Sequence, residues 1–370
     1  MRWLAVLAGI ALSASCLGSR TTRCANGAIC PEGLACTEQA PQVCAEVENI
    51  DACRGAEDRT PCSSPLEPMG TCSMGTCVPC RPDLVECRYA EWRVMTSPTA
   101  VPLLALWVAA ADEVYAAGTD GTIVRYDGAA WTVFEPAPPT TDVLVGIWRA
   151  PTGELYVIAA NGGVFRYRGD AWETITPAVT VPLFGIWGTD ATNVLVVGDG
   201  GRIQRHDGTA WTAMTSGTMV PLRSLWGTSA ANIVAAGNLG EIRHYDGMTW
   251  QAPPGTPLAG LTLRGVWTGA SGAAVAVGNL GTGAMIAMQS GPTWAQHSIP
   301  TMYLSGVWGR TGDDIYAVGT GGTIVRWGGE AWTSMTAPAS EILNAVGGAE
   351  GNVFAVGAGG TILRYSPGTN

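Results

Sequence analysis

Two series of tryptophans repeat along this chain with one shared period of about 40 residues, and this period limits the possible folds more than any other feature. The first series comprises Trp92, Trp131, Trp172, Trp211, Trp250, Trp294 and Trp332. The second comprises Trp107, Trp148, Trp187, Trp226, Trp267 and Trp308, and its next position is Gly347. Because two independent series with one period do not arise by chance, we interpret residues 88–370 as a repeat array.

Each repeat contains four short segments typical of strands. The first is apolar and ends on a tryptophan, as in LFGIW; the second reads NVFAVG or similar; the third reads GTIVRYDG; the fourth carries the other tryptophan, as in AWTVF. Short strands joined by glycine turns indicate antiparallel blades. Since the strands are mostly apolar, both faces of each blade must be covered, as in a β-propeller.

The two ends of the array give the number of blades. The segment around Trp92 matches the end of a third strand and a fourth strand, and the last repeat, which ends near Tyr365, has no fourth strand. The N-terminal strand is therefore predicted to complete the last blade, which leaves no exposed edge in the ring. The predicted fold class is all-β: a seven-bladed β-propeller of four-stranded antiparallel blades, closed by its N-terminal strand and preceded by a small disulfide-rich module.

The first residues indicate export and lipidation. Arg2 precedes the apolar run Trp3–Leu12, which predicts a signal peptide over residues 1–15. Ser13-Ala14-Ser15-Cys16 resembles a bacterial lipobox, although Ser13 stands where leucine is usual. Cys16 is therefore the predicted lipidation site. The alternative is an ordinary signal peptide that is cleaved nearby.

All cysteines precede the repeats, and residues 16–87 are predicted to be a lipidated N-terminus with a cysteine-rich module. Besides Cys16 there are ten: Cys24, Cys30, Cys36, Cys44, Cys53, Cys62, Cys72, Cys77, Cys80 and Cys87. Ten cysteines can form five disulfides, whose pairing the spacing leaves open. The spacing of Cys77 and Cys80 also fits a redox or zinc motif, but the nearest histidine is His206, so a structural disulfide is the favoured interpretation.

The repeat unit AVGxGGTIxRYDGxxW, present over Asp313–Trp332 and Asn352–Tyr365, resembles the BNR-like repeats of photosystem II stability-factor propellers. It is also similar to the tryptophan-rich propeller lipoproteins of myxobacteria. The resemblance covers residues 88–370 and implies a propeller. It implies much less about function, because propellers carry unrelated activities.

Composition excludes several functions. The chain has no lysine, which rules out Schiff-base and P-loop chemistry, and its formal charge of −10 argues against nucleic-acid binding. Three histidines, His206, His244 and His297, lie in different repeats, and the first two are near positions held elsewhere by tyrosine and arginine. We therefore predict no metal site, no cofactor and no catalytic residue. The recurring third-strand arginines are expected to stack on blade tryptophans or to pair locally; they are Arg125, Arg166, Arg205, Arg326 and Arg364.

Departures from the repeat mark the candidate binding site. Arg223 and Arg264 occupy one first-strand position of adjacent blades four and five, where other blades have apolar or small polar residues. They are predicted to face the mouth of the central channel and to bind an anion. The alternatives are surface drift and a structural pairing with Glu241. Blade five also lacks the RYDG element, as degeneration or as a modified contact edge.

Together these observations predict a non-enzymatic lipoprotein of the outer membrane or cell surface, or otherwise a secreted protein. The propeller is expected to bind a protein or a glycan as a monomer. The membrane is expected to be contacted through the lipid anchor alone. The alternative function is a propeller-type polysaccharide hydrolase or lyase.

Overall fold

The computed structural model describes residues 91–178, 181–254, 258–269 and 274–366, together with the backbone of seven short strands nearer the N-terminus. Its contacts divide the chain into two compact units, one formed by Met1–Glu91 with Ser366–Asn370 and one by Trp92–Tyr365. Within the described residues no helix is long and apolar enough to cross a membrane.

The seven short strands of the first unit form three small antiparallel sheets. They are β1 (Thr22–Arg23) with β2 (Ile29–Cys30), β3 (Leu34–Cys36) with β4 (Cys44–Glu46), and β5 (Pro61–Cys62) with β6 (Gly70–Ser73) and β7 (Thr76–Pro79). The predicted signal peptide, the lipidation of Cys16 and the side chains of the ten other cysteines lie outside the described residues.

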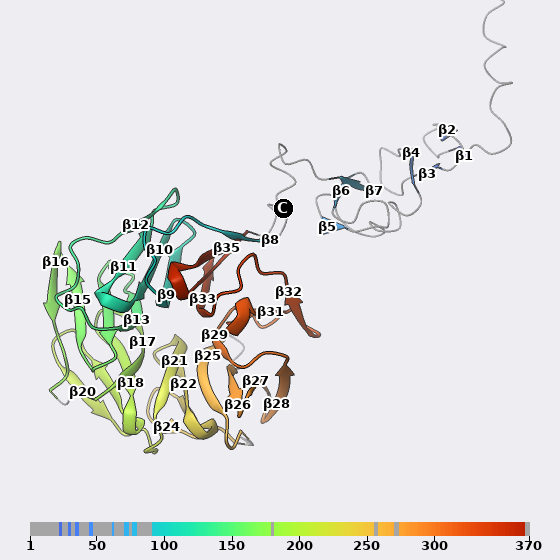
Figure 1. Cartoon of the computed structure of the whole chain (residues 1–370). Helices are drawn as coiled ribbons and strands as arrows, with labels where there is room; N and C mark the ends of the chain where they lie inside the picture. The colour runs from blue at the N-terminus through green and yellow to red at the C-terminus, as the bar shows by residue number, and fades with distance from the viewer. Residues whose placement is uncertain are drawn as a thin grey trace, which may run out of the picture. The chain divides into compact units, whose positions relative to one another are not determined.

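The second unit is a seven-bladed β-propeller of four-stranded antiparallel blades, which confirms the predicted fold class (Figure 1). From the inner strand outwards, blades one to four are β9 (Leu103–Ala110), β10 (Glu113–Gly118), β11 (Ile123–Tyr126) and β12 (Trp131–Val133); β13 (Leu144–Arg149), β14 (Leu155–Ala159), β15 (Val164–Arg168) and β16 (Ala171–Thr174); β17 (Leu183–Asp190), β18 (Asn193–Gly198), β19 (Ile203–His206) and β20 (Trp211–Met214); and β21 (Leu222–Ser229), β22 (Asn232–Gly237), β23 (Ile242–Tyr245) and β24 (Trp250–Gln251). Blades five to seven are β25 (Thr262–Thr268), β26 (Ala274–Leu280), β27 (Gly283–Ser290) and β28 (Thr293–Ile299); β29 (Leu304–Thr311), β30 (Asp314–Gly319), β31 (Ile324–Trp327) and β32 (Trp332–Met335); and β33 (Leu343–Ala349), β34 (Asn352–Gly357), β35 (Ile362–Ser366) and β8 (Glu91–Val94). Blade five keeps four strands although its sequence lacks the RYDG element.

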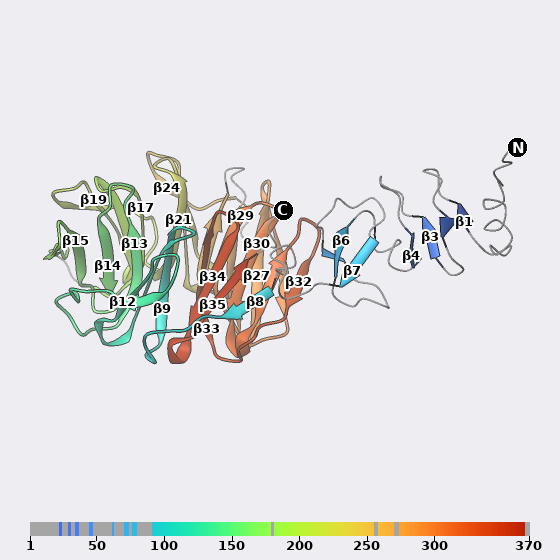
Figure 2. The same cartoon turned by 90° about the horizontal axis from the view of Figure 1, so that it is seen from above.

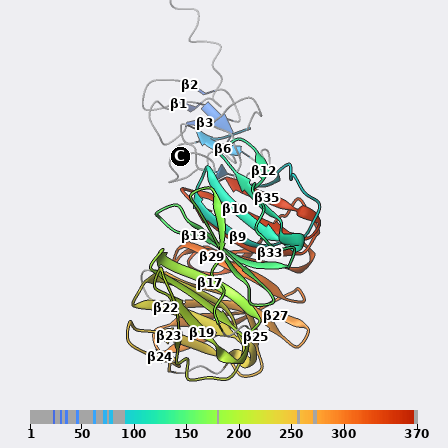
Figure 3. The same cartoon turned by 90° about the vertical axis from the view of Figure 1, so that its left-hand side faces the viewer.

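The N-terminal strand β8 closes the ring, as predicted. It is the outermost strand of the last blade, beside β35 (Figure 2), while β9 and β33 of the first and last blades lie side by side (Figure 3). Trp92 on β8 is 4% exposed, and its ring lies 5.5 Å from that of Tyr365 and 6.3 Å from that of Tyr316. The ring is thus sealed by sheet pairing and by aromatic packing.

A short 3-10 turn joins the second and third strands of five blades. These turns are η2 (Thr119–Gly121), η3 (Asp199–Gly201), η4 (Asn238–Gly240), η5 (Thr320–Gly322) and η6 (Ala358–Gly360). The last glycine of each turn contacts the linker that leads into a neighbouring blade. At Gly360, for example, φ is +72° and a Cβ would lie 2.0 Å from the carbonyl oxygen of Thr99. Only glycine fits this conformation at so close an approach, which explains the repeated glycine pair.

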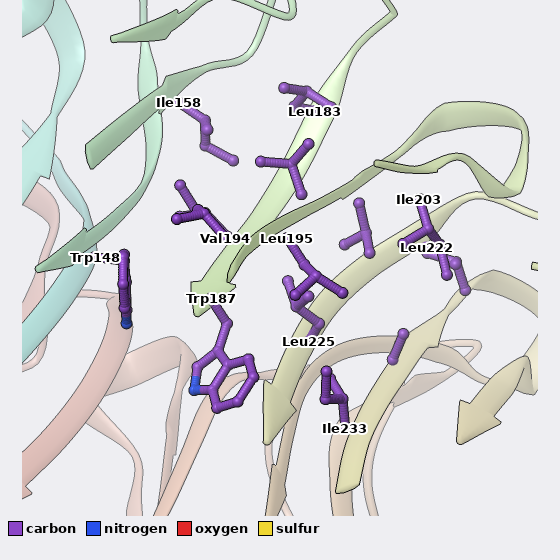
Figure 4. Packing of buried hydrophobic residues seen from close by; sticks show 14 of the residues in the cluster. Trp148, Ile158, Leu183, Trp187, Val194, Leu195, Ile203, Leu222, Leu225 and Ile233 are labelled. Carbon is purple, nitrogen blue, oxygen red and sulfur yellow. The ribbon is translucent and has the colours of Figure 1, made fainter. Parts of the chain in front are cut away.

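The hydrophobic core lies between blades, and Figure 4 shows it where blades two, three and four meet. Trp148 is 1% exposed and packs over Gly188 of the next blade, where a Cβ would lie 2.9 Å from the indole ring. Trp187 packs over Gly227 in the same way, at 2.7 Å. The tryptophan and the glycine that follows it in the repeat therefore form one contact between adjacent blades.

The third strands end on an aromatic residue that holds the next turn. The Tyr126 hydroxyl donates to the Gly128 carbonyl over 2.6 Å, and His206 occupies the same register in blade three. His206 is 2% exposed, stacks on Trp211 at 4.9 Å and accepts a hydrogen bond from the Gly208 N–H at Nδ1. It is a structural residue, as its sequence position indicated.

His206 is expected to make stability depend on pH. Burial, and secondarily the charge of Arg166, lower the pKa of His206 below its usual 6.5. The unfolded chain therefore takes up a proton that the folded chain refuses, and stability is lost as the pH falls below about 6.5. We expect the melting temperature of His206→Tyr to exceed that of the wild type increasingly between about pH 7.5 and about pH 5. Parallel curves for the two proteins would contradict this assignment.

Candidate functional site

The inner strands of all seven blades surround a central cavity of 170 Å³. Its wall consists of successive rings of side chains, one per blade. The rim comprises Leu104, Val145, Phe184, Arg223, Arg264, Ser305 and Asn344; below it lie the small residues Ala105, Gly146, Gly185, Ser224, Gly265, Gly306 and Ala345; and below these the branched residues Leu106, Ile147, Ile186, Leu225, Val266, Val307 and Val346. The middle ring is small because adjacent inner strands approach closely there: a Cβ at Gly306 would lie 3.1 Å from the Ala345 Cα.

Two tryptophans form the floor of this cavity. Trp107 and Trp226, from the first and fourth blades, are half-buried, and their ring centroids lie 5.8 Å apart. In the next blade the residue that receives such a tryptophan is glycine at Gly188 and Gly227, but it is Arg149 opposite Trp107 and Thr268 opposite Trp226. Because these side chains fill the seat between blades, the two indoles turn towards the axis and meet.

The rim is polar on one side, where Arg223, Arg264, Ser305 and Asn344 come from consecutive blades. The Arg223 Nε donates to Asn238 Oδ1 over 2.5 Å, and its guanidinium lies over the Phe184 ring at 5.0 Å. These contacts fix the guanidinium at Nε and along one face.

Arg264 repeats this arrangement in blade five. Its Nε donates to Asn279 Oδ1 over 3.4 Å, and its guanidinium lies over the Tyr303 ring at 4.5 Å. Among the described residues, no carboxylate lies within 4 Å of either guanidinium and no side chain or backbone group accepts from their terminal nitrogens. The structure therefore holds two oriented guanidinium groups whose bidentate edges have no protein partner in the described part of the chain.

The electrostatics of the rim fit this geometry. Burial, and then the neighbouring charge of Arg264, lower the pKa of Arg223, while Asp199 partly opposes them. Glu241, considered as a structural partner of the pair, instead binds Arg243, with Oε1 2.7 Å from Nε. That alternative was wrong because Glu241 and Arg243 project from the same strand segment and reach each other directly. Ser305, which also lines the cavity, has a buried Oγ without a hydrogen-bond partner.

The sequence analysis missed the residues that hold and flank the arginines. Asn238-Leu239-Gly240 and Asn279-Leu280-Gly281 share the sequence NLG, which no other blade has at this position. Recurrence in the two blades that carry the rim arginines was the available signal. Leu239 has φ +55° where other blades place glycine or Asp120, and it is 67% exposed. A left-handed conformation costs a residue with a Cβ roughly 1–2 kcal/mol, so an apolar side chain is displayed there at the expense of stability.

The recurring third-strand arginines are structural, but they do not stack on tryptophans as expected. Arg326 pairs with Asp314 at 2.8 Å and lies over Tyr316, and Arg364 donates to Asn352 Oδ1 at 2.8 Å and lies over Phe354. The partner rings belong to second strands because that strand, rather than the tryptophan strand, places its aromatic residue beside the guanidinium.

None of the three histidines lines the cavity. His244 Nε2 is 2.8 Å from Asn232 Oδ1, and the His297 ring lies 6.1 Å from that of Trp327. Over the described residues, no three histidine, aspartate, glutamate or cysteine side chains gather as a metal site would require.

The comparisons with known proteins concern the fold. No family model and no curated protein matches this sequence. Among solved structures, Ycf48 bound to D1 peptide is similar with a TM-score of 0.62 and 17% identity, over 76% of this chain and 98% of that one. Ycf48 from Cyanidioschyzon merolae gives 0.61 and 16%, over 76% and 100%. Virginiamycin B lyase from Staphylococcus aureus gives 0.65 and 12%, over 75% and 99%. The chain has the propeller fold of these proteins. At such identities, the likeness extends to fold alone.

Proposed function

We propose that this chain is a non-enzymatic, lipid-anchored protein of the cell envelope, whose propeller binds a protein or a glycan at the rim of its central cavity. The observation that carries the binding proposal is the pair Arg223 and Arg264. Each guanidinium is held at Nε by an asparagine and stacked on a ring, which leaves its other edge free for a carboxylate or a similar anion.

The location rests on Cys16 and on the signal-peptide pattern before it. A lipid on Cys16 would hold the protein at the outer membrane or cell surface. The mass of the intact mature protein tests this part, since an unmodified Cys16 would leave a secreted protein.

The solved Ycf48 structure supports the binding proposal, because in it a propeller of similar fold is bound to a peptide. The alternative function is a polysaccharide hydrolase or lyase, and a lyase is also among the similar folds. The cavity wall over the described residues includes no carboxylate, histidine or tyrosine. Acid–base catalysis needs such groups at the reacting atoms, so the geometry favours binding.

The test is binding of two acidic probes, an oligogalacturonate and a leucine–glutamate dodecapeptide, measured by calorimetry on the full chain carrying Cys16→Ser. We expect at least one probe to bind, and Arg223→Ala with Arg264→Ala to weaken it at least about 100-fold, because two charge-assisted contacts are lost. The melting temperature should stay nearly unchanged, since the pair is mutually repulsive.

The matched control is Arg125→Ala with Arg168→Ala, which removes the same charge from exposed third-strand positions. Equal weakening by both double variants would indicate a general charge effect and would contradict a site at the rim. Release of unsaturated or reducing sugar from the oligogalacturonate would establish the enzymatic alternative.

A further inference from the structure

The two blades with a rim arginine also display an exposed leucine beside it. Arg223 binds Asn238 and Arg264 binds Asn279, and the residues that follow these asparagines, Leu239 and Leu280, are 67% and 50% exposed. Asn238 and Asn279 are 41 residues apart in the sequence, as are the two arginines. Guanidinium and leucine therefore form one composite unit, present in blades four and five.

Exposed aliphatic side chains gather at this end of the blades. The exposed large apolar residues in the 3-10 turns, in the β26–β27 turn and in the linkers between blades are Val143, Met219, Leu239, Leu280, Met302 and Ile342. Met219 and Met302 are 82% and 63% exposed, and they lie in the linkers before β21 and β29, on either side of the two arginine blades. Methionine and leucine exposed around a cavity rim are typical of a protein-binding surface.

We infer that the partner is a protein, bound through a segment whose acidic group enters between Arg223 and Arg264 while apolar side chains on either side of that group pack on Leu239 and Leu280. This inference rests on the proposed binding function and specifies its ligand. The charges are complementary, because two guanidinium groups without a described carboxylate partner face a ligand in a chain of formal charge −10.

A glycan fits this surface less well. Sugars pack on exposed aromatic faces, whereas the exposed large apolar side chains of the described residues are all aliphatic. An anionic membrane also fits less well, because exposed carboxylates of Asp120, Asp199 and Glu341 lie at the same end of the blades. Like charges would oppose its approach.

The test compares the leucine–glutamate dodecapeptide with a leucine–lysine dodecapeptide, the oligogalacturonate and phosphatidylglycerol vesicles, all with the full chain carrying Cys16→Ser. We expect the leucine–glutamate peptide to bind most tightly. Leu239→Gly with Leu280→Ser should weaken that peptide at least about 10-fold, because two apolar contacts are lost, while leaving the melting temperature unchanged or higher. The glycine relieves the left-handed strain at position 239.

The control is Met248→Ser with Val133→Ser, which removes exposed apolar side chains from another turn and from an outer strand. These changes should leave peptide affinity within about 2-fold of the wild type. If the arginine variant abolishes peptide binding and the leucine variant does not change it, the protein-partner inference is overturned and the proposed function stands. If neither variant changes binding, both fail. Tighter binding of the oligogalacturonate or of the vesicles than of the peptide would also overturn the inference.

Discussion

A chain that begins at residue 100 is expected to aggregate or to melt far below a chain that begins at Arg81. The shorter chain lacks β8, so β35 becomes an exposed edge strand of the last blade. It also loses Trp92, which is 4% exposed and packs on Tyr365 and Tyr316. An unpaired apolar edge promotes association between molecules, so light scattering and thermal unfolding should both separate the two chains.

A pair of substitutions on β8 tests closure without truncation. Trp92→Ala should lower the free energy of unfolding by about 3–5 kcal/mol, because a buried indole leaves a cavity between blades. Val94→Ala on the same strand should change it by less than about 0.5 kcal/mol, since Val94 is 60% exposed. The measurement is denaturant unfolding of the full chain. Equal stability of the two variants would mean that β8 does not seal the ring.

Gly227→Ala is expected to destabilise the propeller by about 3 kcal/mol, the upper end for overpacking a core. A Cβ at this position would lie 2.7 Å from the Trp187 ring and 2.9 Å from the backbone carbonyl oxygen of Asn232. Neither group can yield easily, because the indole is enclosed between blades and the carbonyl belongs to a sheet. The loss should be measured as a lower midpoint of denaturant unfolding.

The matched control is Gly328→Ala, where a Cβ would meet nothing within 4 Å. The same methyl group there should leave stability unchanged or slightly higher, because alanine restricts the unfolded chain. If both alanine variants were equally stable, the close packing of Trp187 over Gly227 would not be a determinant of blade assembly.

The sequence by itself determined the architecture of the propeller. The tryptophan period set the length of each blade, the glycine turns set its four strands, and the incomplete repeats at the two ends predicted β8 as the closing strand. These features could be read because they are local and are repeated at every blade. Arg223 and Arg264 could be singled out for the same reason, as departures from a repeated position.

Only the tertiary structure decided what surrounds these arginines. Asn238 is fifteen residues from Arg223 in the chain, and sheet register brings it to Nε, while the Phe184 ring comes from the neighbouring blade. The floor of the cavity was likewise unforeseen, because Trp107 and Trp226 meet across the axis when Arg149 and Thr268 occupy their seats between blades. Periodicity specifies which residues share a position in successive blades. Closing the ring brings together residues that share no local pattern, and that closure builds the site.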